Sequence, residues 1–210
     1  MKLEVVSDQR VGQGGFLQLR RLVLKNRRED GSLSRSYPCD FIERPVGLDA
    51  VAVVLFEAGA VAAPRVLLRD ALRPALTLGR PDGVSYWCSE VVAGLIENGD
   101  VGEDGLRRRA VQEIAEEAGY VVAPESVIFL GSPVHMSPGV IAERIWIMAV
   151  GVDPTTASAP TGDGSPMEES HRSRWLPLEA ALTDCVDAKT EIALRRFRDH
   201  LAAAHGSPRT

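Results

Sequence analysis

The chain has 210 residues, 45% hydrophobic and 25% charged, which is enough to bury the core of one globular domain with a small appendage. A formal net charge of −5 argues against a surface that coats nucleic acid, and three isolated cysteines argue against a disulfide framework. The first ten residues lack the apolar core of a signal peptide, and no apolar run approaches the length of a membrane span. We therefore expect a cytoplasmic protein that binds neither nucleic acid nor membrane.

Residues 1–44 are predicted to form a β arm. The stretch 16–24 holds apolar positions suited to a strand, and a polar turn at 28–31 leads to a second extended segment at 36–43. A hairpin of this size buries too little apolar surface to be stable alone. We therefore expect the arm to depend on the rest of the chain or on a second copy.

Residues 45–205 are predicted to form a mixed α/β domain. The continuous apolar run at 50–56 is typical of a strand buried on both faces. Residues 152–170 are rich in Pro, Thr, Ala, Gly and Ser, which predicts a mobile loop, and 187–203 have the pattern of an amphipathic helix. Further strands are expected at 66–69, 91–93, 127–130, 144–150 and 175–178.

The helix expected after residue 100 ends with three carboxylates, those of Glu113, Glu116 and Glu117. At about 100° per residue they fall within roughly a 100° arc, and Gly119 behind them is suited to ending the helix. Negative charges at the negative end of the helix dipole are unfavourable, and Glu113 and Glu117 repel each other as an i,i+4 pair. A bound cation such as Mg²⁺ would offset both effects, and the alternative is a solvated acidic face.

The segment 94–120 resembles the Nudix box, the loop–helix motif of the Nudix hydrolases. In that family a glycine is followed by five residues, a glutamate, seven residues and then Arg-Glu-apolar-any-Glu-Glu-any-Gly-apolar. The Glu-x-x-Glu-Glu-x-Gly core is intact at 113–119, and five residues separate Gly94 from Asp100. Asp100 stands where the pattern has glutamate, Gln112 stands where it has arginine, and eleven residues instead of seven separate them.

These departures leave two points open. Arg108 or Arg109, the latter one helical turn before Glu113, could replace the missing arginine. A member that keeps the fold without catalysis, as a ligand sensor or scaffold, is the alternative that Asp100 and Gln112 suggest.

Three further segments resemble the ADP-ribose and nucleotide-sugar pyrophosphatases within this family. Residues 69–74 (RDALRP) resemble their Arg-Gln-Tyr-Arg-Pro segment, and 137–143 (SPGVIAE) resemble their Ser-Pro-Gly-x-x-x-Glu loop. Residues 187–190 (DAKT) match the start of their last helix, and the strands before residue 45 match an arm that usually helps to form a dimer.

The resemblance implies a Nudix fold, an α/β/α sandwich with a mixed sheet and an N-terminal β arm, in a homodimer. It implies Mg²⁺, with Mn²⁺ as a substitute, held by the carbonyl of Ala93 and by Glu113, Glu116 and Glu117. Arg73 would bind substrate phosphate, Glu143 would be the general base, and Glu116 would also take part in catalysis. ADP-ribose, cleaved to AMP and ribose 5-phosphate, is the first substrate implied; GDP-mannose, another nucleotide sugar or an oxidised nucleotide are alternatives.

Other side chains near these motifs give weaker signals. Glu97 either helps the metal site or caps the loop. Glu168 and Glu169 lie where some relatives place a metal-binding or basic glutamate, but the composition around them favours a solvated loop. Structural roles are expected for His135, for Cys88 as a small buried residue, and for Trp87 through core packing.

Overall fold

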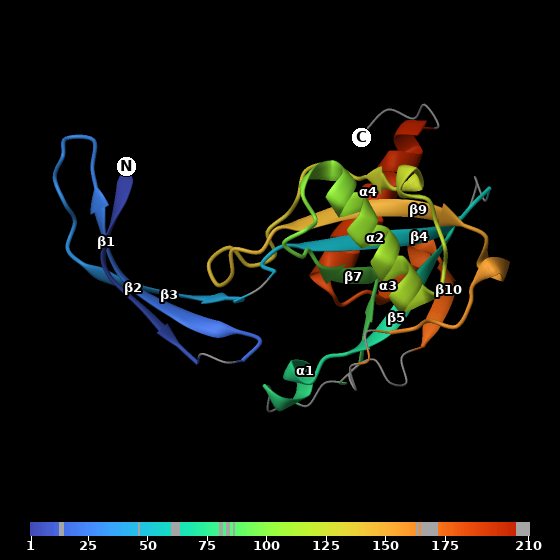
Figure 1. The fold of residues 1–210 in the computed structure, drawn as a ribbon, viewed down its shortest axis with the longest axis horizontal. Coiled ribbons are helices and arrows are strands. Elements are labelled where there is room, and N and C mark those ends of the chain that lie inside the picture. Colours follow the sequence, from blue (N-terminus) through green and yellow to red (C-terminus); the bar gives the residue numbers. More distant parts are fainter. Residues whose placement is uncertain are drawn as a thin grey trace. The chain divides into compact units, whose positions relative to one another are not determined.

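The computed structural model describes residues 1–12, 15–45, 47–59, 64–79, 82, 85, 87–162, 164 and 172–204. The chain divides into two compact units, whose elements are labelled in Figure 1. Met1–Asp49 and His135–Arg144 form the smaller unit, and Ala50–Val134 with Ile145–Thr210 form the larger one. The N-terminal strands are therefore joined by a segment from much later in the chain.

The smaller unit is a three-stranded antiparallel sheet in the order β1-β2-β3. Its strands are β1 (Lys2–Val11), β2 (Gln18–Arg27) and β3 (Tyr37–Glu43). The segment 135–144 adds a single parallel bridge, Ile42 with Ile141, and the Ile42 amide donates to the carbonyl of Val140 at 2.7 Å. The loop that carries Glu143 is thus anchored on β3.

Strand β1 was not predicted from the sequence. Almost all of its residues are exposed, and the alternation of Leu3 and Val5 already breaks at Val6, which is too short a pattern to indicate a strand. Its pairing with β2 is accompanied by cross-strand ion pairs, Arg27 with Glu4 and Arg20 with Asp8, each at 2.6 Å. Such pairs of opposite charge on neighbouring strands stabilise a sheet without apolar burial.

The larger unit contains a seven-stranded mixed sheet in the order β10-β5-β4-β9-β8, with β6 paired to β5 and β7 paired to β4. Strands β4 and β9 run parallel, whereas β5 and β7 are antiparallel to β4. The strands are β4 (Ala50–Glu57), β5 (Arg65–Leu72), β6 (Trp87–Glu90), β7 (Val92–Leu95), β8 (Ile128–Phe129), β9 (Ile145–Val152) and β10 (Ser173–Pro177).

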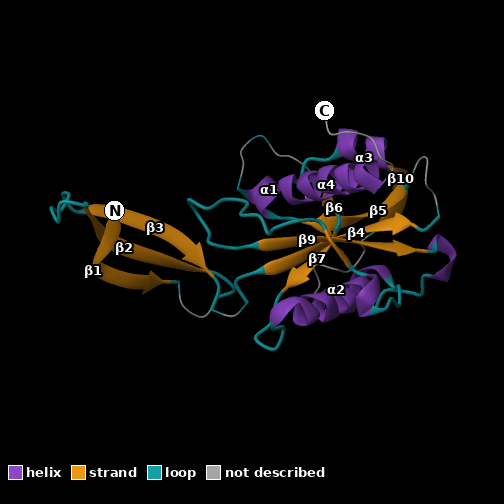
Figure 2. Ribbon diagram, turned by 90° about the horizontal axis from the view of Figure 1, so that it is seen from above, coloured by secondary structure: helices purple, strands orange, loops and turns teal. Residues whose placement is uncertain are grey.

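Helices cover both faces of this sheet, with α2 on one face and α3 and α4 on the other (Figure 2). This arrangement confirms the predicted α/β sandwich with a mixed sheet. The helices are α1 (Ala75–Leu78), α2 (Gly102–Ala118), α3 (Leu178–Asp184) and α4 (Ala188–Ala204), with 3₁₀ turns η1 (Pro124–Ser126) and η2 (Pro154–Thr156). No helix in the described part of the chain is long and apolar enough to cross a membrane.

Strand β4 is buried on both faces, as its apolar run predicts. Toward α2, Val51 and Val53 belong to the same core cluster as Ile114. Toward α4, the ring of Phe56 lies 4.7 Å from that of Phe197. Each fully buried side chain of this size contributes about 1.5–3 kcal/mol, so α2 and α4 are held firmly against the strand that supports the site.

Candidate metal and phosphate site

The site begins where β7 leads into α2. Gly94 is paired with Val51 of β4, and a Cβ added to it would overlap the carboxyl group of Glu113. Glycine thus leaves room for the Glu113 carboxylate against the strand, whereas a side chain at this position would displace it. The sequence motif places these two residues 19 positions apart, and the fold brings them into contact.

Helix α2 ends as its sequence predicts. Gly119 has φ +72°, the left-handed conformation that glycine adopts without strain, and its amide donates to the carbonyl of Ala115 at 3.1 Å. The carboxylates of Glu113, Glu116 and Glu117 lie in the last two turns before this cap.

Glu117 is the most deeply buried of the three carboxylates, with 6% of the residue exposed. Its Oε1 accepts a hydrogen bond from Nη1 of Arg69 in β5, and its Oε2 accepts one from the amide of Ala93 at 3.0 Å. Ala93, predicted to take part through its carbonyl, is therefore adjacent to a predicted ligand. Arg69, for which no role was predicted beyond its place in the 69–74 segment, also contacts this group.

Glu113 is partly buried beside this group. Burial raises the pKa of its carboxyl to about 7, and the charges of Glu117 and Glu116 act in the same direction. The guanidinium of Arg109, with Nη1 3.6 Å from Glu113 Oε1, opposes them. Burial together with the two neighbouring carboxylates therefore disfavours the ionised form of Glu113.

Of the two arginines that could replace the motif arginine, Arg109 is the one that lies beside the carboxylates. Arg109 is buried, and besides Glu113 it contacts Asp100 at 2.8 Å and Glu97 at 3.1 Å. Arg108 is exposed. Asp100 also accepts the amide of Glu97 at 2.9 Å, so the acidic residue of the motif closes the loop, and Glu97 belongs to the same network. The side chain of Gln112 instead donates to Glu116 Oε1 at 2.9 Å.

Arg73 lies in a second cluster of charges. Its guanidinium donates to both oxygens of Glu90 in β6, at 2.7 and 2.8 Å, yet 46% of its side chain is exposed. Lys189 at the start of α4 donates to Glu90 Oε2 at 3.0 Å and also lies 3.0 Å from Asp187 Oδ2. Burial alone would raise the pKa of Glu90, but Arg73 and Lys189 lower it to about 2. The exposed part of Arg73 remains accessible to an anionic group.

The predicted segment 187–190 fixes the start of α4 against the sheet. Asp187 Oδ2 accepts the amide of Thr190 at 2.9 Å, as an N-terminal cap does, and Thr190 Oγ1 accepts the amide of Val91 at 3.0 Å. Glu90 itself was missed by the sequence reasoning. Its position directly before the apolar residues 91–93 could have indicated a buried carboxylate, and a buried carboxylate requires charged or hydrogen-bonding partners.

Glu143 belongs to the smaller unit. Its Oε1 lies 2.6 Å from Nη1 of Arg44, and both side chains are largely buried. Nδ1 of His135 bonds the backbone carbonyl of Glu143 at 2.9 Å, which is a structural contact as expected. The role of Glu143 as a base stays a prediction.

Two of the remaining expectations can be compared with the structure. Cys88 is buried, as expected, and burial raises the pKa of its thiol to about 11. The prediction that Trp87 packs in the core is wrong, because this residue is 40% exposed at the beginning of β6. Glu168 and Glu169 lie outside the described residues.

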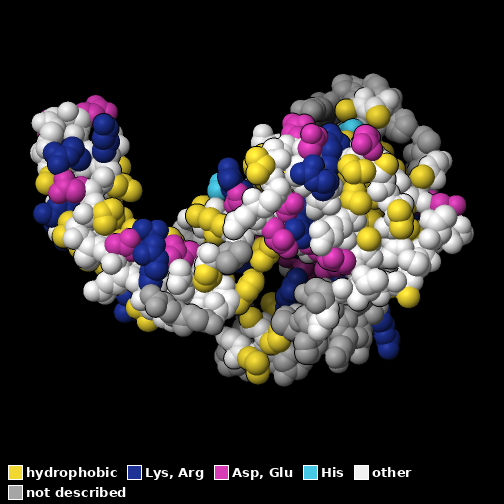
Figure 3. All heavy atoms as spheres, viewed as in Figure 1, with side chains coloured by type: hydrophobic (Ala, Val, Ile, Leu, Met, Phe, Trp, Pro, Cys, Tyr) yellow, Lys and Arg dark blue, Asp and Glu magenta, His cyan; other side chains and the backbone are white. Residues whose placement is uncertain are grey.

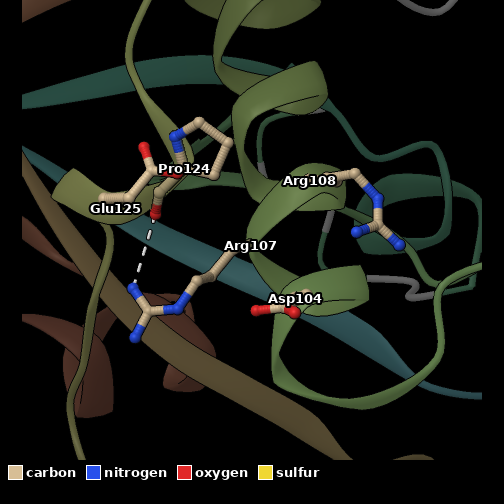
Figure 4. Close-up of a pocket in the computed structure, with 5 residues that line it drawn as sticks. All are labelled: Asp104, Arg107, Arg108, Pro124 and Glu125. Atoms are coloured by element: carbon tan, nitrogen blue, oxygen red, sulfur yellow. Dashed lines mark hydrogen bonds between the residues drawn. The ribbon is translucent and has the colours of Figure 1, made fainter.

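A cavity of about 530 Å³ lies on another side of α2, lined by Asp104, Arg107, Arg108, Pro124 and Glu125 (Figure 4). Arg107 donates to the carbonyl of Val127, and its guanidinium lies 4.8 Å from the centre of the Phe129 ring. Glu113, Glu116 and Glu117 are not among the residues that line this cavity, so it is separate from the carboxylates.

The chemistry of the carboxylates fits a hard divalent cation, because their donors are oxygens and they carry excess negative charge. Within the described residues, no three His, Cys, Asp or Glu side chains already converge on a point that a metal ion could occupy. The carboxylates instead face arginines, Arg69 at Glu117 and Arg109 at Glu113. On the face seen in Figure 3, acidic and basic side chains are likewise interspersed over the larger unit.

Comparisons with known proteins agree with this description. No family model matches the chain. Over 74 residues it is 45% identical to the ADP-ribose pyrophosphatases of Escherichia coli (strain K12) and Shigella flexneri, a match that covers 34% of this chain and 31% of each relative. The chain thus matches less than a third of the length of these curated relatives.

Among solved structures, a crystal structure of an ADP compounds hydrolase matches with a TM-score of 0.69 and 16% identity, over 99% of this chain and 98% of that one. This likeness extends over both units and shows that the fold is shared. The predicted α/β sandwich with a mixed sheet is thereby confirmed, and the local identity agrees with the predicted resemblance to ADP-ribose pyrophosphatases.

Proposed function

We propose that this protein is a Mg²⁺-dependent pyrophosphohydrolase that cleaves a nucleoside diphosphate linked to a sugar, with ADP-ribose giving AMP and ribose 5-phosphate. The observation that carries the proposal is the contact between Gly94 and the Glu113 carboxylate, which joins the loop and the helix of the motif in one site. The 45% identity to ADP-ribose pyrophosphatases over 74 residues supports this choice of substrate.

Glu113, Glu116, Glu117 and the carbonyl of Ala93 would hold the metal. Mg²⁺, or Mn²⁺ in its place, supplies neutralisation of phosphoryl charge and lowers the pKa of a bound water. The closeness of Ala93 to Glu117, through its amide at 3.0 Å, supports a joint role of strand and helix. Gln112 holds Glu116 from the exposed side of α2 and would orient it.

Arg73 would bind the phosphate of the substrate through the exposed part of its guanidinium, while Glu90 fixes the side chain from behind. A planar guanidinium matches phosphate oxygens in geometry and charge. Glu143 would accept the proton of the attacking water. Glu116 would take part in catalysis as one of the residues that hold the metal. The loop 135–144, which carries Glu143, is anchored on the N-terminal arm.

A coupled assay tests this proposal. ADP-ribose has no terminal phosphate, so alkaline phosphatase releases phosphate only after its pyrophosphate bond has been cut. We expect phosphate release from ADP-ribose with Mg²⁺ and Mn²⁺. With a chelator, which would also inactivate the phosphatase, AMP is measured directly and none is expected. A screen of GDP-mannose, other nucleotide sugars and dinucleotides, and of nucleoside triphosphates without the phosphatase, ranks the alternatives. A thermal shift with ADP-ribose but no turnover of any substrate would instead identify a non-catalytic binding protein.

We further propose that the N-terminal arm forms a homodimer. Several large apolar side chains of β1 are exposed, including Leu3, Val5 and Val6, which is unfavourable in a free monomer. The free thiols of Cys39, Cys88 and Cys185 are consistent with a reducing compartment, so we place the protein in the cytoplasm.

A further inference from the structure

Arg69 is a buried cation placed directly on a proposed metal ligand. Both Arg69 and Glu117 are 6% exposed, and Nη1 of Arg69 donates to Oε1 of Glu117. The other oxygen of Glu117 is held by the amide of Ala93 at 3.0 Å. Each oxygen of this carboxylate therefore has a donor before any metal is bound.

The ion pair between Arg69 and Glu117 stabilises the metal-free protein electrostatically. A buried carboxylate without a partner is strongly destabilising, and Glu117 also raises the pKa of neighbouring Glu113. A positive charge at Arg69 offsets the burial of Glu117 and reduces the repulsion within the cluster. A divalent cation bound to Glu117 would perform the same two tasks.

The guanidinium and a divalent cation repel each other, and both would use Oε1 of Glu117. We propose that Arg69 is an internal counter-cation, which stabilises the carboxylates without metal and is displaced from Glu117 when the metal binds. This inference rests on the proposed function. It differs from the simpler view that Arg69 orients Glu117 for the metal, because the two views predict opposite effects on metal affinity.

The test compares Arg69→Gln with Arg65→Gln as a matched control. Arg65 lies on the same strand, and its ion pair with Glu57 at 2.7 Å is more exposed. Binding of Mn²⁺ alone is measured by electron paramagnetic resonance, and thermal unfolding is recorded with a chelator. We expect Arg69→Gln to bind Mn²⁺ about tenfold more tightly and to unfold several degrees lower without metal. Arg65→Gln should leave Mn²⁺ affinity unchanged.

If Arg69→Gln does not fold, a second variant, Arg69→Lys, is used in the same test. Arg69→Lys keeps the positive charge but loses the planar guanidinium, so it should hold the Glu117 carboxylate less firmly. We therefore expect this variant to bind Mn²⁺ roughly threefold more tightly than the wild type. Unchanged or weaker Mn²⁺ affinity in a folded Arg69 variant would overturn the counter-cation role and leave the proposed function standing. A wild-type protein that binds no Mn²⁺ would overturn the metal site itself, and this inference with it.

Discussion

The carboxylate of Glu113 occupies the space in which residue 94 would carry a side chain, so Gly94 and Glu113 depend on each other. The contact joins a strand end to the last turns of a helix, and it explains why a glycine opens the motif.

Gly94→Ala should displace the Glu113 carboxylate and reduce activity by roughly a hundredfold, because small misplacements of reacting groups have effects of this size. The added methyl group meets only the end of the flexible Glu113 side chain, so the free energy of unfolding should change much less than the activity. Activity and urea unfolding of this variant are compared with those of Gly99→Ala, whose new Cβ would meet nothing within 4 Å. Equal activity of the two variants would show that the Glu113 carboxylate has no part in turnover.

Glu117→Gln should lower turnover by at least roughly a hundredfold while the protein stays folded, because glutamine keeps the shape of the side chain but not its charge. Mg²⁺ should stabilise the wild type against thermal unfolding and this variant much less. Glu103→Gln, in the exposed first turn of α2, is the control and should behave as the wild type. Full activity of Glu117→Gln would refute its assignment as a metal ligand.

Arg109→Gln should destabilise the protein by about 3 kcal/mol, since it leaves Asp100 and Glu113 without their buried partner. Arg108→Gln removes an exposed charge next to it and should change stability by less than about 0.5 kcal/mol. Urea unfolding at neutral pH measures both. Similar losses for the two variants would contradict the replacement of the motif arginine by Arg109.

Glu90 predicts a pH dependence of stability. Its pKa is lowered in the folded state from 4.5 to about 2, so its ionised form is stabilised by folding. This contribution, about 3 kcal/mol, is complete above pH 4.5 and is lost as the pH falls toward 2. Glu90→Gln should therefore be less stable than the wild type at pH 7, and the difference should shrink between pH 4.5 and 2. A constant difference over that range, measured by urea unfolding, would exclude the ion pairs with Arg73 and Lys189 as its cause.

The β1 surface can be tested with Leu3→Glu combined with Val5→Glu, which places two charges on one side of an exposed strand. We expect the dimer to dissociate into folded monomers, as measured by light scattering. Lys2→Glu, on the same strand, places a negative charge there without removing a large apolar side chain and should leave the dimer intact. A double variant with the mass of a dimer would place the interface elsewhere.

The sequence was most informative where one local pattern dominates. The apolar run of β4 and the glycine that ends α2 both lie where they were expected. Strand β1 was missed because its residues are exposed on both faces and are paired through charges instead.

The sequence motif predicted the glutamates of the site but not the residues that contact them. Glu113 and Glu117 follow from the spacing along one helix, whereas Arg69 and Glu90 reach the charged clusters through strand pairing, which the sequence does not reveal. The ion pair of Glu143 was not predictable for the same reason, because its partner Arg44 lies 99 residues earlier in the chain.

The four additional residues of the motif amount to about one turn of helix. Eight residues separate Asp100 from Arg109, close to the seven of the family pattern, and three more separate Arg109 from Glu113. The arginine has thus moved back by one turn along α2 and still faces the glutamates. An insertion of one or two residues at the same place would have rotated it by about 100° or 200°, away from Glu113. The helix of this chain thus accommodates about one additional turn while the contact between Arg109 and Glu113 is kept.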